Sequence, residues 1–134
     1  MSLGMAHELL SGNTPFLNQL WIAMDEIKDT SDLKVRFDLP ALKTLHVGIH
    51  RFHDLLENFE NCKSVEVLEY HGVIEDDAWD SLQSHLSRRT WPKLLVLDVR
   101  NLHVDVGEAR VRLTREKMEE ILKTFDIKVK LIKD

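Results

Sequence analysis

A short spaced pattern occurs four times in this chain, and it constrains the fold more than any other feature. Each copy has an apolar residue, a second one three positions later, and a third apolar residue or a tyrosine two positions beyond that. The copies are Pro15–Ile22, Pro40–Val47, Lys63–Tyr70 and Pro92–Val99. Successive copies begin roughly 20–29 residues apart, a period typical of stacked structural repeats. Because one unit of this size cannot bury its apolar face alone, the pattern predicts strands that stack side by side.

The segments between the copies mostly carry the period of an amphipathic helix. Asp76 and Asp77 near the start of the third such segment, and Arg88 and Arg89 near its end, complement a helix dipole. Thr114 is a predicted N-cap for the helix after the fourth copy. The predicted apolar helix faces consist of Phe52, Leu55, Leu56 and Phe59; of Trp79, Leu82 and Leu86; and of Met118, Ile121, Leu122 and Phe125.

The remaining segments have weaker patterns. The tail Ile127–Ile132 alternates apolar and basic residues, which predicts a fifth and last strand. In Asp25–Asp38 the run Asp29–Asp32 interrupts any helix, so we expect a short turn there. We expect Leu102–Leu113 to be a solvated loop, although insertions in repeat proteins often carry function.

The repeats resemble the leucine-rich repeat family, in the irregular strand/helix form found in the substrate-recognition regions of F-box proteins. The segments Leu39–Leu45, Asn61–Leu68 and Trp91–Val99 carry the resemblance, which covers roughly residues 14–132. It implies an α/β solenoid of about five sequential parallel strands, with helices on the convex face. The chain lacks the asparagine that the family places after each strand, so the resemblance implies no regular subtype.

We expect residues 1–134 to form a single domain, because the chain is 15.6 kDa and shows no linker-like tract. Stacked repeats need polar caps at both ends. No dedicated cap precedes Pro15, which leaves two interpretations open. The chain is a fragment of a longer array, or a short helix around Met5–Leu10 is itself the cap.

Composition argues against several classes of function. The net charge is −5 with both signs interleaved, so we expect no nucleic-acid partner. No apolar run is long enough to cross a bilayer, and the single cysteine, Cys62, suits a reducing compartment, so we expect an intracellular, cytoplasmic protein without a membrane partner. We interpret Cys62 as a buried small hydrophobe.

No catalytic motif is present in the sequence, and we therefore expect neither an enzyme nor a cofactor. The histidines His46, His50 and His53 are close in sequence, and His71 is predicted to lie on the strand beside His46. Their spacing matches no known metal-site signature, so we interpret them as solvated and expect no metal site.

The alternation of each predicted strand places one row of side chains on the concave face of the sheet. That row consists of Trp21, His46, Glu69 and Asp98, and His71 and Arg100 are predicted to lie beside it. Tryptophan and arginine are common binding hot spots. We therefore predict a non-enzymatic protein–protein interaction module that binds a protein partner, of unknown identity, through these six residues, with substrate recognition as one such role. For Trp21, packing under a loop or a missing repeat remains an equal alternative.

A second interpretation keeps the same strands and helices but closes them as a compact regulatory domain, similar to the sulfate-transporter/anti-sigma-antagonist family. Leu94–Val99 would then be a central strand. That family has a phosphorylatable hydroxyl directly after this strand, whereas the first hydroxyl here is Thr114. Sequential parallel pairing would favour the solenoid, and a mixed, non-sequential sheet would favour the regulatory domain.

Overall fold

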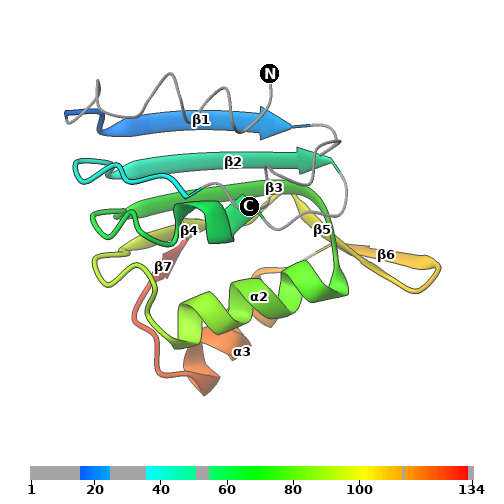
Figure 1. Cartoon of the computed structure of the whole chain (residues 1–134). Coiled ribbons are helices and arrows are strands. Elements are labelled where there is room, and N and C mark those ends of the chain that lie inside the picture. Colours follow the sequence, from blue (N-terminus) through cyan, green and yellow to red (C-terminus); the bar gives the residue numbers. More distant parts are fainter. Residues whose placement is uncertain (1–15, 25–35, 51–54, 113, 133–134) are drawn as a thin grey trace.

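The structure, a computed structural model, describes residues 16–24, 36–50, 55–112 and 114–132, and they form a mixed α/β fold with an open sheet (Figure 1). Two α-helices, α2 (Asp76–Ser87) and α3 (Arg115–Thr124), and one 3-10 helix, η2 (Leu55–Phe59), accompany the sheet. The strands are β1 (Gln19–Met24), β2 (Thr44–His50), β3 (Val67–Glu75), β4 (Val96–Asp98), β5 (Leu102–Val106), β6 (Ala109–Arg112) and β7 (Lys130–Leu131).

The five strands that the sequence predicts pair in chain order. The main path of the sheet is β1-β2-β3-β4-β7, and every pair along it is parallel. This sequential parallel order confirms the prediction from the repeats, and it differs from the non-sequential order that the regulatory-domain alternative requires. The last strand is shorter than the predicted Ile127–Ile132, because only Lys130 and Leu131 pair with β4.

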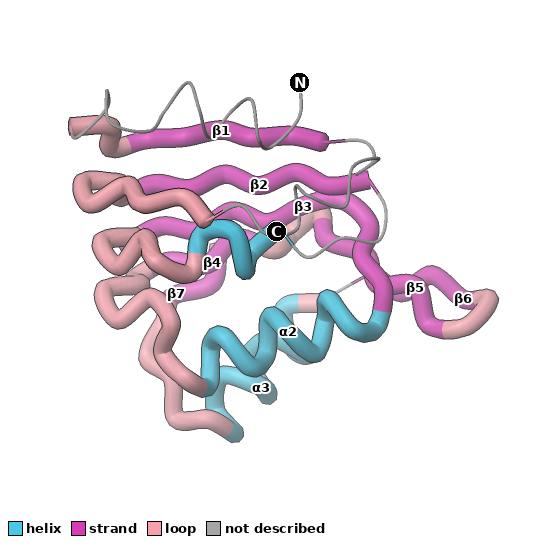
Figure 2. The backbone as a smooth tube through the Cα atoms, viewed as in Figure 1, coloured by secondary structure: helices cyan, strands magenta, loops and turns pink. Residues whose placement is uncertain are grey.

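The expectation of a loop over Leu102–Leu113 is wrong. This segment contains β5 and β6, an antiparallel hairpin that turns at Gly107, whose φ of 62° is left-handed. β5 pairs in parallel with Gly72–Glu75 of β3, beyond the point where the short β4 has ended. Leu102 and Val104 are buried, which anchors β5 to the core, whereas β6 projects from the body of the molecule (Figure 2).

Two of the three predicted helices are present in full. α2 buries Leu82 and Leu86 while Trp79 packs partly against the core, and the Thr114 side chain accepts a hydrogen bond from the Lys117 N–H of α3 at 3.3 Å. After the second copy, only the 3-10 helix η2 is described, with Leu56 and Phe59 buried. The sequence predicts Phe125 on the apolar face of α3, but this residue is 39% exposed because it lies at the C-cap of the helix. The expected turn within Asp25–Asp38 and the short helix Met5–Leu10 fall mainly or wholly outside the described residues.

The same backbone turn precedes three successive strands. In each copy, the N–H of the first apolar position donates to the carbonyl three residues earlier, on Leu39, Cys62 or Trp91. A second contact recurs between neighbouring copies. The residue directly after the first apolar position of one copy uses its backbone carbonyl to accept two consecutive N–H groups of the next copy. These acceptors are Asn18 O for Lys43 and Thr44, Lys43 O for Glu66 and Val67, and Glu66 O for Leu95 and Val96. The sequence repeat is therefore also a repeat of hydrogen bonding.

The helices lie on one side of the sheet, and the core lies between them and the strands (Figures 1 and 2). Leu45, Leu68 and Leu97 occupy equivalent register positions on that side and are fully buried. Since side chains alternate along a strand, their neighbours in sequence point to the opposite face. Among the described residues, no helix or strand packs on that opposite face.

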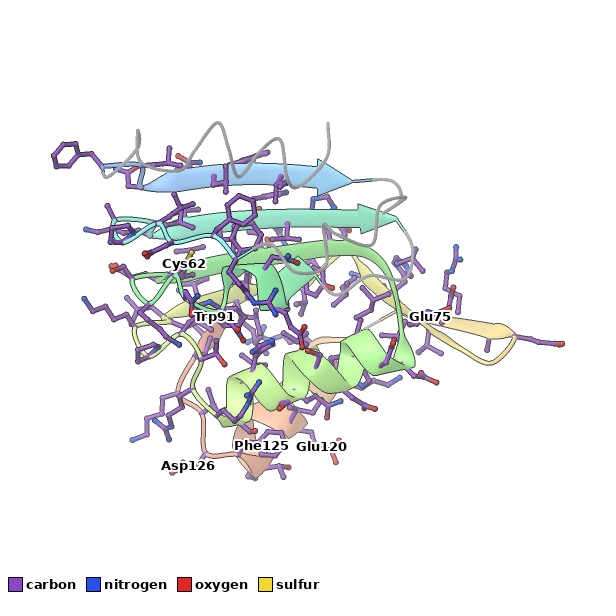
Figure 3. The ribbon with its side chains drawn as sticks, viewed as in Figure 1. Cys62, Glu75, Trp91, Glu120, Phe125 and Asp126 are labelled. Atoms are coloured by element: carbon purple, nitrogen blue, oxygen red, sulfur yellow. The ribbon has the colours of Figure 1, made fainter. Side chains whose placement is uncertain are left out.

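Both α-helices end in a Schellman motif with a non-glycine residue in the left-handed conformation. These residues are Arg89, with φ of 56°, and Asp126, with φ of 53°. At the end of α2 the N–H groups of Arg89 and Thr90 donate to Leu86 O and His85 O. The equivalent bonds at the end of α3 join Asp126 and Ile127 to Lys123 O and Leu122 O, close to the labelled Phe125 and Asp126 of Figure 3.

Arg89→Gly is expected to raise the free energy of unfolding by about 0.5–1 kcal/mol, because glycine adopts this conformation without a Cβ clash. Arg88 is the matched control, since it is also an exposed arginine but has a right-handed φ of −81°. Arg88→Gly is expected to lower stability. Urea denaturation of both variants checks the prediction, and a loss of stability in Arg89→Gly would contradict it.

Candidate functional site

The row of side chains predicted on the open face is present in the predicted register. Trp21 pairs with His46, His46 with Glu69, and Glu69 with Asp98, across four adjacent parallel strands. Trp21 is 66% exposed. His46, Glu69 and Asp98 are partly buried. We refer to these four residues together with His71 and Arg100 as the ladder cluster.

His46 is the centre of the ladder cluster, because it contacts residues of two neighbouring strands. Its ring stacks on Trp21 of β1, with centroids 4.1 Å apart and planes within 8° of parallel. Its Nδ1 contacts the Oε2 of Glu69 on β3. Its Nε2 lies 2.7 Å from the Nε2 of His71, also on β3. These contacts leave the ring of His46 little freedom to rotate.

The His71 ring lies directly over Gly48 of β2. A Cβ atom at position 48 would stand 2.6 Å from His71 Cε1, closer than real Cβ atoms come to a neighbour, and 3.0 Å from His71 Nε2. The absence of a side chain at Gly48 therefore admits the His71 ring and sets its edge against His46, with ring centroids 4.7 Å apart. Burial lowers the pKa of His71, and so does the neighbouring His46, while Glu69 and Asp98 oppose the shift.

Asp98 and Arg100 form the other end of the ladder cluster. The Arg100 guanidinium donates to both carboxylate oxygens of Asp98, at 3.0 Å from Nε and 2.8 Å from Nη2. The Arg100 backbone N–H donates to the same carboxylate at 3.2 Å. The side-chain hydrogen bonds from Arg100 are the main reason that the pKa of Asp98 is lowered. The pair therefore stays ionised.

All six residues that the sequence selected thus lie on one face. Sequence reasoning missed two features of this site, namely the contact between the His46 and His71 rings and the role of Gly48 beneath it. The register Gly48↔His71 follows from aligning the second and third copies, so the signal was present in the sequence. The orientation of the His46 and His71 rings cannot be read from the sequence.

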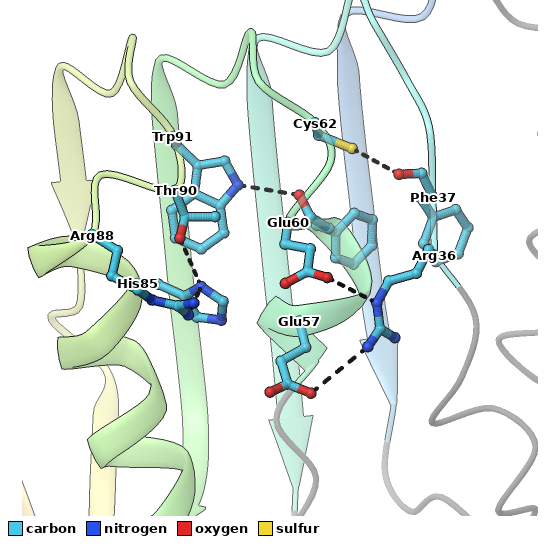
Figure 4. A network of polar contacts seen from close by, with 10 residues as sticks. Arg36, Phe37, Glu57, Glu60, Cys62, His85, Arg88, Thr90 and Trp91 are labelled. Atoms are coloured by element: carbon cyan, nitrogen blue, oxygen red, sulfur yellow. Dashed lines mark hydrogen bonds and ion pairs between the residues drawn. The ribbon is translucent and has the colours of Figure 1, made fainter.

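Within the described part of the chain, no three His, Cys, Asp or Glu side chains are arranged to hold a metal ion. The side chains of His50 and His53 lie outside it. Cys62 is fully buried, as predicted for a small core residue, and its Sγ lies 3.5 Å from Phe37 O (Figure 4). Burial raises the pKa of its thiol, which disfavours the reactive thiolate.

The polar groups on the helix side of the sheet hold structure together. The buried Trp91 donates from Nε1 to Phe59 O at 3.2 Å, and His85 Nδ1 lies 2.9 Å from Thr90 Oγ1 (Figure 4). Arg36 contacts Glu57 and Glu60 beside them. A cavity of about 290 Å³ opens between the ends of α2 and α3, next to Trp91. These groups join the repeat turns to the helices.

Comparison with known proteins adds no relative. No protein-family model, curated protein or solved structure matches this chain. None of the helices in the described ranges has the length and apolar character that a membrane span requires.

Proposed function

We propose that this protein is a non-enzymatic interaction module that binds a protein partner through the ladder cluster. The observation that carries the proposal is Trp21, a large aromatic side chain on β1 that is 66% exposed and stacked on His46 of β2 on the open face. An exposed tryptophan with a fixed orientation offers a large contact area at a low entropic cost.

The rest of the ladder cluster is ordered in advance of binding. Glu69 and His71 fix His46, and Arg100 fixes Asp98 through two hydrogen bonds. Association therefore immobilises few additional rotamers, which lowers the cost of forming an interface. A partner would meet an aromatic surface beside polar groups with defined positions, a combination that favours specific recognition.

We further propose that the strand units form a leucine-rich-repeat-like solenoid, as the resemblance implies. The recurring turn before three strands and the recurring shared carbonyl support this proposal. Solenoids of this kind bind partners along the strand face, and substrate recognition in a cytoplasmic assembly would be one such role.

The test compares partner capture by two matched triple variants of the full chain. The ladder variant carries Trp21→Ala, Glu69→Arg and Asp98→Arg. The control carries the same kinds of change on the exposed surface of α3 and its C-cap, namely Phe125→Ala, Glu116→Arg and Glu120→Arg. Circular dichroism first establishes that both fold.

We expect a protein captured from an extract of the native cells by the wild type to be retained by the control and lost from the ladder variant, with at least a tenfold weaker Kd. That factor corresponds to about 1.4 kcal/mol, a modest loss for a hot spot. Equal retention by both variants, or loss from the α3 variant alone, would place the binding surface elsewhere and contradict the proposal.

A further inference from the structure

The contact between His46 and His71 restricts how many protons the two rings can hold. In the tautomer that carries its proton on Nδ1, next to the Glu69 carboxylate, His46 presents Nε2 as an acceptor and the Nε2–H of His71 donates to it. A first additional proton keeps this bond, because one ring still presents an N–H and the other a lone pair. A second additional proton puts an N–H on both Nε2 atoms, and two donors cannot face each other at 2.7 Å.

We propose that the His46–His71 pair is a pH-sensitive switch within the ladder cluster, closed when it holds at most one extra proton and opened by a second. The inference rests on the proposed function in one respect, since it assigns partner binding to the closed form. His46 would carry the change to the docking surface, because its ring is stacked on Trp21. Acid would thereby reorganise the aromatic surface that the partner meets.

The groups that face the pair from each strand support two steps of protonation. On β1 the facing residue is Trp21, whose ring stacks on His46. On β3 the Glu69 carboxylate contacts His46 Nδ1 and so places a negative charge beside the pair. Asp98 on β4 is nearby, but its carboxylate is already paired with Arg100. It therefore stabilises a second proton on the histidine pair less than an unpaired carboxylate would. His103 of β5 lies farther along the strands, opposite Val73.

The lowered pKa of His71 agrees with this order, because burial and the neighbouring His46 both oppose its protonation. An unfolded histidine titrates near pH 6.5. Between that value and the lower folded-state pKa the unfolded chain binds more protons than the folded chain. Stability is therefore complete above about pH 6.5 and falls as the pH drops through the pKa of folded His71.

The first experiment uses the free protein and needs no partner. A two-dimensional NMR titration follows the ring signals of His46 and His71 and the indole N–H of Trp21, which is assigned with Trp21→Phe. We expect His71 to titrate below about pH 6.5 and the Trp21 signal to shift with the same midpoint. His71→Gln is expected to abolish the Trp21 transition, and the matched change His103→Gln to leave it intact.

Gly48→Ala tests the geometry without altering any titrating group. Its Cβ would displace the His71 ring from His46, so the Trp21 transition should disappear and His71 should titrate closer to its ordinary value. A Trp21 signal that does not move with pH, or a transition that survives in His71→Gln, would overturn the switch. So would an unchanged titration in Gly48→Ala.

The second experiment measures the affinity of the captured partner between pH 7.5 and pH 5. If closure requires release of one proton, Kd should rise by about tenfold for each pH unit below the His71 pKa, and His71→Gln should remove this dependence. A partner that binds through the ladder cluster with no pH dependence would overturn the switch and leave the proposed function intact. If instead binding does not involve the ladder cluster, the proposed function fails while the titration of the free protein still decides the switch.

Discussion

Leu68→Ala is expected to lower the free energy of unfolding by about 2–5 kcal/mol, whereas Glu69→Ala, one residue along, should change it by less than about 1 kcal/mol. Leu68 is fully buried, and in register it stands between Leu45 and Leu97, which are also buried. Truncation leaves a cavity that these neighbours cannot fill without moving their strands. Glu69 points to the open face, where its side chain is 34% exposed.

Urea denaturation followed by circular dichroism measures both losses, provided that the slope of the transition is the same in each variant. Leu45→Ala and His46→Ala are a second adjacent pair with the same expected contrast. Similar losses at both members of either pair would show that the two faces of the sheet are equally covered, which is incompatible with an open ladder face.

Trp91→Ala is expected to be at least as damaging, with a loss of about 3–5 kcal/mol. Trp91 is 3% exposed and lies beside His85 near the end of α2 (Figure 4). It donates to Phe59 O and lies 5.2 Å from the buried His85 ring. Its removal therefore creates a cavity and also takes away one of the two donors to Phe59 O, which then keeps only the Cys62 N–H.

Trp91→Phe separates these two effects, because it preserves much of the volume but deletes the indole N–H. We expect an intermediate loss of about 1–3 kcal/mol. Trp79→Phe is the matched control, since Trp79 is only partly buried on α2, and its loss should stay below about 1 kcal/mol. A Trp91→Phe variant as stable as the wild type would show that the bond to Phe59 O contributes nothing.

The strand positions and their faces were predictable, because each is specified locally. In every copy the apolar spacing fixes which residues turn inward, and Leu45, Leu68 and Leu97 are buried accordingly. Aligning the copies then gives the parallel register without further information. The sequence overestimates the length of β7. The alternation of apolar and basic residues extends over 127–132, but the partner strand β4 spans only three residues.

The β5–β6 hairpin was not predictable from its own sequence, although Ala109–Arg112 does alternate. β5 can pair with β3 only because β4 stops at Asp98 and leaves the second half of β3 open. At that point Gly72 has a φ of 115°, which only glycine adopts readily. Such pairing depends on the length of another strand, so no local pattern reports it.

The candidate site was predictable as a surface and not as a set of contacts. Period-two alternation places Trp21, His46 and Glu69 on the same face. The approach of His46 to His71 depends in addition on the ring torsions and on the space above Gly48. Side-chain torsions are chosen by packing in three dimensions, which the spacing of residues along the chain does not encode.

Three backbone carbonyls each accept two N–H groups of the following copy, and this arrangement determines how such a chain can grow. Each copy is aligned by bonds to its immediate predecessor, at Asn18, Lys43 and Glu66 in turn. The alignment of any two neighbours is thus independent of how many copies precede or follow them. Gene duplication of one copy would lengthen the sheet by a strand while every existing row of side chains kept its order, so the open face can be extended in discrete steps.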